Sequence, residues 1–214
     1  MHVIYGGTFD PIHNGHLRVA IELRERLGID RIHLVPSHVP PHRDEPGGSS
    51  EERLALLSLA LEDEPGLAVD TRELARGGSS YTADTLNQLR QELGPDAPLA
   101  MVVGTDAFAA FDQWREWGRI PELAHIILVT RPQGELTPGS PPHQMLAQRR
   151  VRDVAALKGA PAGRILEVDP PLLEISATGI RERLQQGRSI RYLVPDAVLA
   201  RIAQAGLYRD ERRH

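Results

Sequence analysis

His13 and His16 lie three residues apart in the sequence, and Gly15 stands between them. They follow a short apolar run and a glycine-rich turn, and a helical pattern begins at Leu17. A strand, a glycine-rich turn and a helix start in this order are typical of a phosphate site, because the free N–H groups of the helix start attract anions. Imidazole suits the same task, since its N–H donates to a phosphate oxygen. We therefore expect both histidines to face one anion.

Gly6 and Gly7 open this turn, and their lack of a Cβ atom lets a ligand approach the backbone. A glycine pair or a lone histidine is a weak signal by itself, because turns and helix starts use both for structural reasons. The close grouping of glycines and histidines in one turn is a stronger signal. A metal site is disfavoured, since paired zinc ligands on a helix usually lie about four residues apart and the chain has no cysteine.

A second candidate anion site lies near the end of the chain, in the segment 175–181. We expect Ser176 to cap a helix there, so that free backbone N–H groups and the positive end of the helix dipole point outward. Thr178 would add a hydroxyl group and Arg181 a guanidinium, which binds phosphate strongly. Alone, this pattern also fits a capped helix with a surface arginine. Together with the two histidines, it predicts the far wall of a polyphosphate site.

Short apolar runs that alternate with helical patterns must position these residues. The runs are 3–5, 32–35, 67–69, 99–103, 126–129 and 165–168. The helical patterns are 17–27 with Gly28 as its stop, 51–61 with Ser50 as its cap, 82–93, 121–124, 144–157, 178–186 and 195–205. This alternation predicts an α/β fold, a Rossmann-like doubly wound, mostly parallel sheet with helices on both faces.

Two segments are loops by composition, 36–49 and 132–142, because both are rich in proline and glycine. The first holds His38, His42 and Arg43 just past a strand end, where open α/β sheets bind ligands. We expect a functional role for the first loop and a flexible excursion for the second.

Composition bounds the function further. The chain has 214 residues with 29 acidic and 25 basic side chains, a net charge of -4, so no broad basic surface for nucleic acid is expected. It has no cysteine, which excludes disulfides and thiol catalysis and fits a reducing compartment. No apolar run reaches membrane-spanning length and we expect no secretory leader, so we predict a cytoplasmic protein without a membrane partner.

The length favours one domain over residues 1–214, in which the last helices, about 176–208, form a small C-terminal helical part. The oligomeric state stays open, a homo-oligomer included.

Taken together, these segments resemble the nucleotidyltransferase superfamily of adenylyltransferases, which has a His-x-Gly-His turn and a late Ile-Ser-x-Thr-x-x-Arg segment. Within it, the chain is similar to the family of bacterial nicotinate-mononucleotide adenylyltransferases. The matching segments cover nearly the whole chain: Gly6 to His16, Pro36 to Arg43, Ser80 to Leu86, Gly104-Thr105-Asp106 with Trp114 eight residues on, Arg131-Pro132, and Ile175 to Arg181. Ala177 stands where some relatives carry serine, which puts one hydroxyl contact in doubt.

The resemblance implies transfer of AMP from ATP to the phosphate of nicotinate mononucleotide, a step of NAD synthesis that releases pyrophosphate. No general base is needed, because the attacking phosphate is already an anion. Mg²⁺ would be required, held by the ATP phosphates and water rather than by protein side chains. His13, His16 and Arg181 would be the catalytic residues, which bind the triphosphate and the departing pyrophosphate.

The resemblance also implies which residues bind the two substrates. Those for ATP are Gly6, Gly7, Thr8, Phe9, His13, His16, Gly104, Asp106, Ile175, Ser176, Thr178 and Arg181, with Gly104 and Asp106 on the ribose and the backbone around 175–176 on adenine. Those for nicotinate mononucleotide are Trp114 on the pyridine ring, Thr82 and the backbone N–H of Arg115 on its carboxylate, and His42, Arg43 and Arg131 on its phosphate.

Some of these assignments have structural alternatives. Asp106 alternatively caps the helix that follows it, and Trp114 alternatively anchors the core. We expect Trp117 in the core and treat Thr85 as a second-choice acceptor contact.

Other functions stay open at this point. Similar enzymes adenylylate nicotinamide mononucleotide or phosphopantetheine, and the choice between acid and amide can depend on one or two N–H contacts. A nucleotide-binding regulatory domain could keep the phosphate site without turnover, and release of pyrophosphate separates it from an enzyme.

Overall fold

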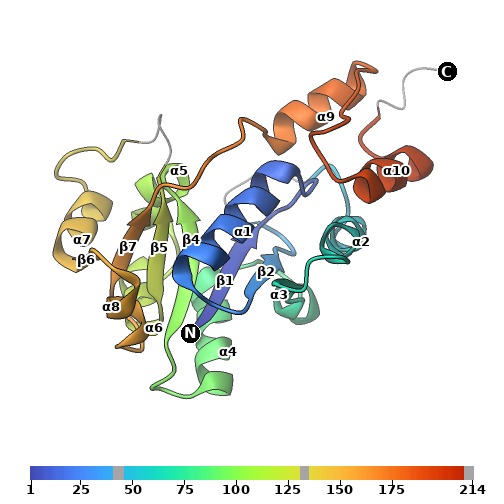
Figure 1. Cartoon of the computed structure of the whole chain (residues 1–214). Coiled ribbons are helices and arrows are strands. Elements are labelled where there is room, and N and C mark those ends of the chain that lie inside the picture. Colours follow the sequence, from blue (N-terminus) through green and yellow to red (C-terminus); the bar gives the residue numbers. More distant parts are fainter. Residues whose placement is uncertain (41–45, 131–134, 210–214) are drawn as a thin grey trace.

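The sheet is entirely parallel in the part of the chain that the computed structural model describes, residues 1–40, 46–130 and 135–209 (Figure 1). Its strand order is β3-β2-β1-β4-β5-β7-β6. The strands are β1 His2–Gly7, β2 Ile32–Pro36, β3 Leu67–Val69, β4 Leu99–Gly104, β5 His125–Val129, β6 Arg150–Val151 and β7 Ile165–Val168. The predicted fold class is confirmed, and so are all six predicted strands. Strand β6 was missed because two residues show no periodicity.

Helices connect the strands and cover both faces of the sheet. They are α1 Asn14–Leu27, α2 Ser50–Leu61, α3 Arg72–Arg76, α4 Thr82–Leu93, α5 Thr105–Ala109, α6 Ile120–Leu123, α7 Pro141–Arg149, α8 Val154–Lys158, α9 Ala177–Gln185 and α10 Asp196–Ala205, with single 3₁₀ turns η1 Phe111–Gln113 and η2 Trp117–Arg119. Helices α3 and α5 were not predicted, because five residues are too short for an amphipathic pattern to be visible.

The prediction of one helix over 144–157 is wrong. Helix α7 begins at Pro141, directly after its cap Ser140, and ends before Arg150, whose backbone is extended. The chain then forms β6, and Asp153 caps the separate helix α8 by accepting from the N–H of Ala156 at 2.8 Å. Consequently, the predicted loop 132–142 ends at Ser140 in its described part.

Ser50 is not the cap of α2. Ser49 is the cap, because its hydroxyl accepts from the N–H of Glu52 at 3.2 Å while the Glu52 carboxylate accepts from the N–H of Ser49 at 2.8 Å. This reciprocal pair is a capping box, and its Ser-x-x-Glu spacing was present in the sequence. Ser50 lies one residue further on and contacts His38 instead.

The core has two layers, one on each face of the sheet. Consecutive strand residues alternate between them, so that Val3 belongs to one cluster and Ile4 to the other. Side chains of α1, α2, α8, α9 and α10 join the first cluster, and those of α4, α5, α6 and α7 join the second. Both faces are therefore apolar, and the polar edge at the strand ends is where a ligand can bind.

Helix α10 packs against α2, and α9 lies at the same end of the molecule (Figure 1). Ile180 of α9 and Ile202 of α10 are 1% exposed and belong to the same cluster as α1 and α2. Within the described residues, no helix combines the length and apolar character needed to cross a membrane.

Candidate active site

The rings of His13 and His16 lie face to face at the carboxyl end of β1. Their centroids are 3.7 Å apart and their planes differ by 25°. His13 caps α1, because its backbone is extended and its Nδ1 accepts from the N–H of His16 at 3.4 Å. The His13 side chain is thereby held at the helix start, where the dipole favours anions.

Phe9 shapes the turn that precedes the histidines. Its backbone has a φ of 49°, which is unusual for a residue with a bulky side chain. Its ring is buried and meets the edges of Tyr5 and His16 at centroid distances of 5.9 and 5.2 Å. Because this ring faces the core, a contact of Phe9 with ATP would involve its backbone.

Gly6 and Gly7 differ in the space around the position that a Cβ atom would occupy. A Cβ on Gly7 would lie 2.9 Å from the Phe9 ring, so Gly7 is required by packing. A Cβ on Gly6 would meet nothing within 4 Å, so the space beside Gly6 is open. Only Gly6 therefore has the room that the prediction of a close ligand approach requires.

The two predicted anion motifs meet at Gly15. A Cβ there would lie 2.9 Å from Nδ1 of His13 and 3.4 Å from the carbonyl oxygen of Ile175. The start of α1 thus lies directly against the segment that leads into α9. Asn14 adds two further bonds, from its side chain to the carbonyl of Tyr192 and from its N–H to that of Leu193, each 2.9 Å long.

Helix α9 presents Arg181 to the histidine turn. Ser176 caps α9 as predicted, since its hydroxyl accepts from the N–H of Gly179 at 3.1 Å. Nη1 of Arg181 donates to the carbonyl oxygen of Asp10 at 2.7 Å and lies 3.4 Å from a carboxylate oxygen of the same residue. Nη2 lies 3.4 Å from the hydroxyl of Thr178. Asp10 and Arg181, 171 positions apart in the sequence, are thus neighbours.

Asp10 binds three further donors through its carboxylate. One oxygen accepts from the N–H of Gly48 at 3.0 Å and from the Tyr208 hydroxyl at 2.9 Å, and the other accepts from the N–H of Gly47 at 2.8 Å. Burial and the Asp10 carboxylate raise the pKa of Tyr208, so its hydroxyl stays protonated and donates. Neither Asp10 nor Tyr208 was predicted as a site residue from the sequence.

Arg53 was also missed, and it is almost fully buried, at 1% exposed. Its guanidinium donates to the hydroxyl of Ser50 and to four backbone carbonyls, those of Thr8, Ser37, His38 and Gly48. Burial lowers the pKa of Arg53, and the nearby Asp10 carboxylate acts in the opposite direction. An arginine among the buried leucines of α2 was the available signal, since the helical pattern puts it on the core face.

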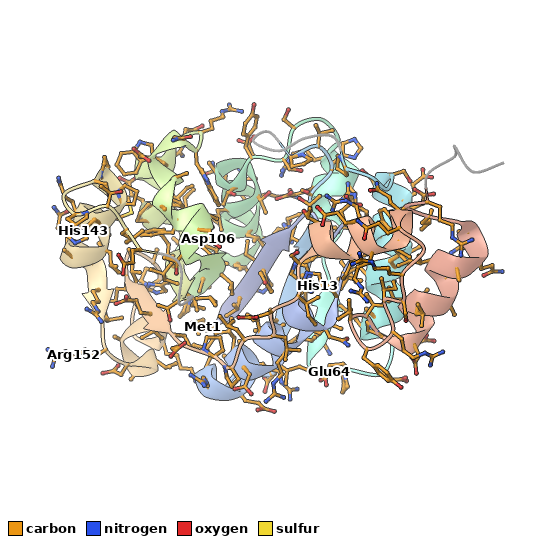
Figure 2. All side chains as sticks on the ribbon, turned by 90° about the horizontal axis from the view of Figure 1, so that it is seen from above. Met1, His13, Glu64, Asp106, His143 and Arg152 are labelled. Carbon is orange, nitrogen blue, oxygen red and sulfur yellow. The ribbon has the colours of Figure 1, made fainter. Side chains whose placement is uncertain are left out.

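Gly104 is the last residue of β4, the strand that pairs with β1, and Asp106 follows it in α5. Figure 2 labels His13 and Asp106 in a view from above the molecule. Gly104 is the cap position of α5, and Asp106 is an exposed residue in the first turn of that helix. The alternative that Asp106 is the helix cap is therefore wrong, because Gly104 occupies that position. This crossover lies where the strand order reverses, the usual ligand site of open α/β sheets.

Two of the predicted acceptor residues, Thr82 and Arg115, lie at the start of α4. Arg115 lies 3.5 Å from the Asp84 carboxylate and stacks over the Tyr81 ring at 4.7 Å, which places it beside Thr82, the first residue of α4. Trp114 is partly buried, and its ring lies 5.0 Å from that of Phe111. Trp117 is partly buried against the same cluster, so burial does not separate the two tryptophans as the prediction supposed.

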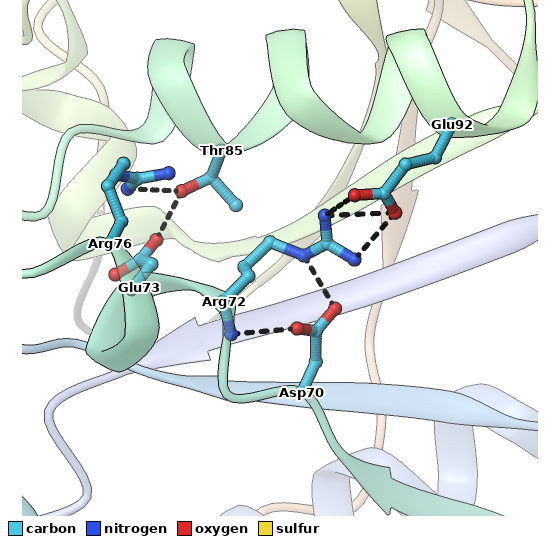
Figure 3. A network of polar contacts seen from close by, with 6 residues as sticks. All are labelled: Asp70, Arg72, Glu73, Arg76, Thr85 and Glu92. Carbon is cyan, nitrogen blue, oxygen red and sulfur yellow. Dashed lines mark hydrogen bonds and ion pairs between the residues drawn. The ribbon is translucent and has the colours of Figure 1, made fainter.

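Thr85 belongs to a polar network that joins α3 to α4 (Figure 3). Its hydroxyl donates to Glu73 at 2.7 Å and accepts from Arg76 at 2.9 Å, and the residue is 1% exposed. Nearby, the guanidinium of Arg72 donates hydrogen bonds to the carboxylates of Asp70 and Glu92. The network fixes the start of α4, so Thr85 positions this helix rather than facing a ligand.

The loop after β2 contacts the entry to α4. The N–H of His38 donates to the hydroxyl of Ser80 at 2.8 Å, and the N–H of Ser80 donates to the carbonyl of Val39 at 2.9 Å. This loop leads to residues 41–45, so His42 and Arg43 lie outside the described residues, as does Arg131.

The donor set favours an anion over a metal ion. In the described ranges, no group of three or more histidine or acidic side chains has a geometry suited to a metal. The buried carboxylate of Asp10 is engaged by N–H and O–H donors. What the site offers is imidazole, guanidinium and helix-start groups, which are donors for phosphate oxygens.

Comparisons with known proteins identify the family of the chain. The pattern that defines the cytidylyltransferase-like family matches residues 4–183. A Marinobacter nauticus protein named probable nicotinate-nucleotide adenylyltransferase is 61% identical over 208 residues, which cover 97% of this chain and 96% of the relative. A protein of the same name from Chromohalobacter salexigens is 53% identical over 204 residues, which cover 95% and 93%.

A solved structure has the same fold. The nicotinic acid mononucleotide adenylyltransferase of Plasmodium falciparum, complexed with NaAD, superposes with a TM-score of 0.72 over 96% of each chain. Its sequence identity is 19%, so this likeness concerns the fold alone.

Proposed function

This chain belongs to the cytidylyltransferase-like family, and from that premise we propose that it is a nicotinate-nucleotide adenylyltransferase, which transfers AMP from ATP to nicotinate mononucleotide. The products are nicotinate adenine dinucleotide and pyrophosphate. One observation carries the proposal: the stacked histidines at the start of α1 lie against the segment that presents Arg181. Imidazole and guanidinium donors at one strand edge suit a triphosphate.

The reaction needs charge stabilisation and positioning more than proton transfer. An oxygen of the acceptor phosphate attacks the α-phosphorus of ATP, and the bond from this phosphorus to the bridging oxygen breaks, with its electron pair leaving on pyrophosphate. His13 and His16 donate to the ATP phosphates, where negative charge grows. Arg181 and Thr178, with the N–H groups at the start of α9, bind the departing pyrophosphate. Gly104 and Asp106 bind the ribose.

We include Mg²⁺ in the proposal, carried on the ATP phosphates and water. The donor-rich site fits a metal that the substrate brings, since Mg²⁺ keeps several waters and commonly binds through substrate phosphates. When bound, it neutralises phosphate charge and so eases the attack of one anion on another.

The acceptor binds on the side of α4 and the loop after β2. Trp114 stacks on the pyridine ring, while Thr82 and the N–H of Arg115 bind the carboxylate. The proximity of Arg115 to the start of α4 supports this assignment. His42, Arg43 and Arg131 bind the acceptor phosphate.

A coupled assay of pyrophosphate release tests the proposal with MgATP and three acceptors side by side. We expect a strong preference for nicotinate mononucleotide over nicotinamide mononucleotide and phosphopantetheine. A preference for either of the other two acceptors would replace the substrate assignment. ATP binding without product from any acceptor would instead favour a regulatory nucleotide-binding domain.

A further inference from the structure

The Asp10 carboxylate connects three segments that are distant in the sequence. It accepts from the loop before α2 through Gly47 and Gly48, and from Tyr208, which follows α10 and lies 198 residues away. Asp10 itself is 5% exposed, so its bonds are shielded from water. Hydrogen bonds to a buried carboxylate are strong and leave its charge well solvated by the protein.

Arg181 contacts the same residue in a different way. Its short bond, 2.7 Å from Nη1, goes to the backbone oxygen of Asp10, whereas its distance to the carboxylate is 3.4 Å. Three neutral donors hold the carboxylate: Gly48 and Tyr208 donate to Oδ1, and Gly47 donates to Oδ2, the oxygen 3.4 Å from Arg181. The backbone oxygen of Asp10 thus holds the guanidinium in place, and its positive charge can still attract an anion.

We propose that Tyr208 is a positioning residue for Arg181, which acts through the Asp10 carboxylate to keep the guanidinium available for pyrophosphate. This inference rests on the proposed function, because that function supplies the anion. Tyr208 does not touch the substrate. Its hydroxyl donates to Oδ1 of Asp10, whereas Arg181 faces Oδ2, so the hydroxyl acts by fixing the orientation of the carboxylate.

The packing around Tyr208 supports a specific role for its hydroxyl. A Cβ on Gly48 would lie 2.9 Å from this hydroxyl and 3.3 Å from the Asp10 carboxylate, and a Cβ on Gly47 would lie 3.2 Å from the Tyr208 ring and from Cδ of Arg181. The two glycines therefore let the loop, the tyrosine and the arginine pack closely together. Tyr208 thereby ties the end of the chain to the site.

The test is Tyr208→Phe, which keeps the ring and removes only the hydroxyl. Tyr192→Phe is the matched control, since the side chain of Tyr192 is 79% exposed. Inorganic pyrophosphate is titrated into each protein in a calorimeter, and kcat and KM are measured with MgATP and nicotinate mononucleotide. We expect Tyr208→Phe to weaken pyrophosphate binding and lower kcat about tenfold, as for one hydrogen bond to a charged group. KM for nicotinate mononucleotide should stay unchanged, and the control should match the wild type.

A double-mutant cycle separates positioning from a general structural role. In an Arg181→Lys background, Tyr208→Phe should change kcat/KM for ATP by less than about threefold. The reason is that the guanidinium that Tyr208 positions is already absent. Urea unfolding of each variant checks that the proteins are folded. Full additivity of the two losses, or wild-type pyrophosphate binding in Tyr208→Phe, would overturn the inference.

The outcome also stays separable from the proposed function. If the wild type uses none of the acceptors, the function fails, but the pyrophosphate titration still compares Tyr208→Phe with the wild type. If the wild type uses nicotinate mononucleotide and Tyr208→Phe binds pyrophosphate equally well, only the inference fails.

Discussion

At the scale of single residues, the proposed site contains two imidazoles that stack face to face at the start of one helix. His13 is fixed by its cap bond and His16 by the edge of the Phe9 ring. Such preorganised donors stabilise charge that develops on phosphate without any rearrangement during the reaction. Their loss should therefore affect turnover more than ground-state binding.

We expect His16→Ala to lower kcat by about 10²- to 10³-fold with a small change in ATP affinity, as for removal of one transition-state donor. Steady-state kinetics and ATP titration measure the two effects. His143→Ala is the control, because His143 is exposed on α7. A kcat near that of the wild type would refute the role of His16.

We expect Trp114→Ala to raise KM for nicotinate mononucleotide about tenfold and leave KM for ATP nearly unchanged, since aromatic stacking serves only one substrate. Trp117→Ala, in the neighbouring 3₁₀ turn and similarly buried, is the matched control. Equal losses for both substrates, or a loss of thermal stability alone, would make Trp114 a core residue.

At the scale of elements, buried polar groups fix the loops that carry the site. Arg53 of α2 binds backbone carbonyls after β1 and after β2, so one side chain sets the spacing of two strand ends. On the other side of the site, the bonds of Thr85 to Glu73 and Arg76 join α3 to the start of α4 (Figure 3). Each element is aligned by contacts that its own sequence does not contain.

Arg53→Met should lower the free energy of unfolding by about 3–5 kcal/mol, because buried carbonyls lose their donor and the apolar chain replaces none of these bonds. Urea unfolding followed by circular dichroism measures the change. Arg18→Met serves as the control, since the Arg18 side chain is 48% exposed and its ion pair with Glu22 lies at the surface. A loss below about 1 kcal/mol, the level of a surface pair, would show that Arg53 is not the main support of these loops.

At the scale of the whole molecule, histidines with lowered pKa values lie in the strands away from the proposed site. His2 of β1 and His33 of β2 stack with centroids 4.2 Å apart. Burial and the neighbouring His33 lower the pKa of His2 from 6.5 to about 4. Burial also lowers the pKa of His33 and of His125, which is completely buried in β5. The folded chain thus keeps these rings neutral at a pH where the unfolded chain protonates them.

Stability should therefore fall as the pH decreases from 6.5 toward 4, because the unfolded state binds more protons across that range. Above 6.5 the contribution of these histidines is fully present. Urea unfolding at several pH values measures the slope, and His2→Gln should make it shallower, whereas His143→Gln, on the exposed face of α7, should not. Equal slopes in all three proteins would exclude His2 as a source of the dependence.

The organisation of the whole chain also remains open to test. One domain over residues 1–214 stays a prediction, as does the cytoplasmic location. The shared core cluster of α1, α2, α9 and α10 leads us to expect that these helices unfold together.

Local chemistry explains what the sequence by itself determined. Apolar runs identified six of the strands and Ser176 was correctly predicted as a helix cap, because these signals depend only on neighbouring residues. Ser49 and Ser50 both suit a helix cap by residue type, and only the Ser-x-x-Glu spacing favours Ser49. Where an element was very short, as at β6, no local signal existed.

The tertiary structure alone decided how these parts meet. The bonds of Asp10 to Tyr208 and of Arg53 to the strand ends join residues that no spacing rule connects. The chain must first form its sheet and close its core before such groups become neighbours. Burial then makes each of them costly to leave unpaired, and that cost selects one arrangement of the turn, the loop and the last helices around the site.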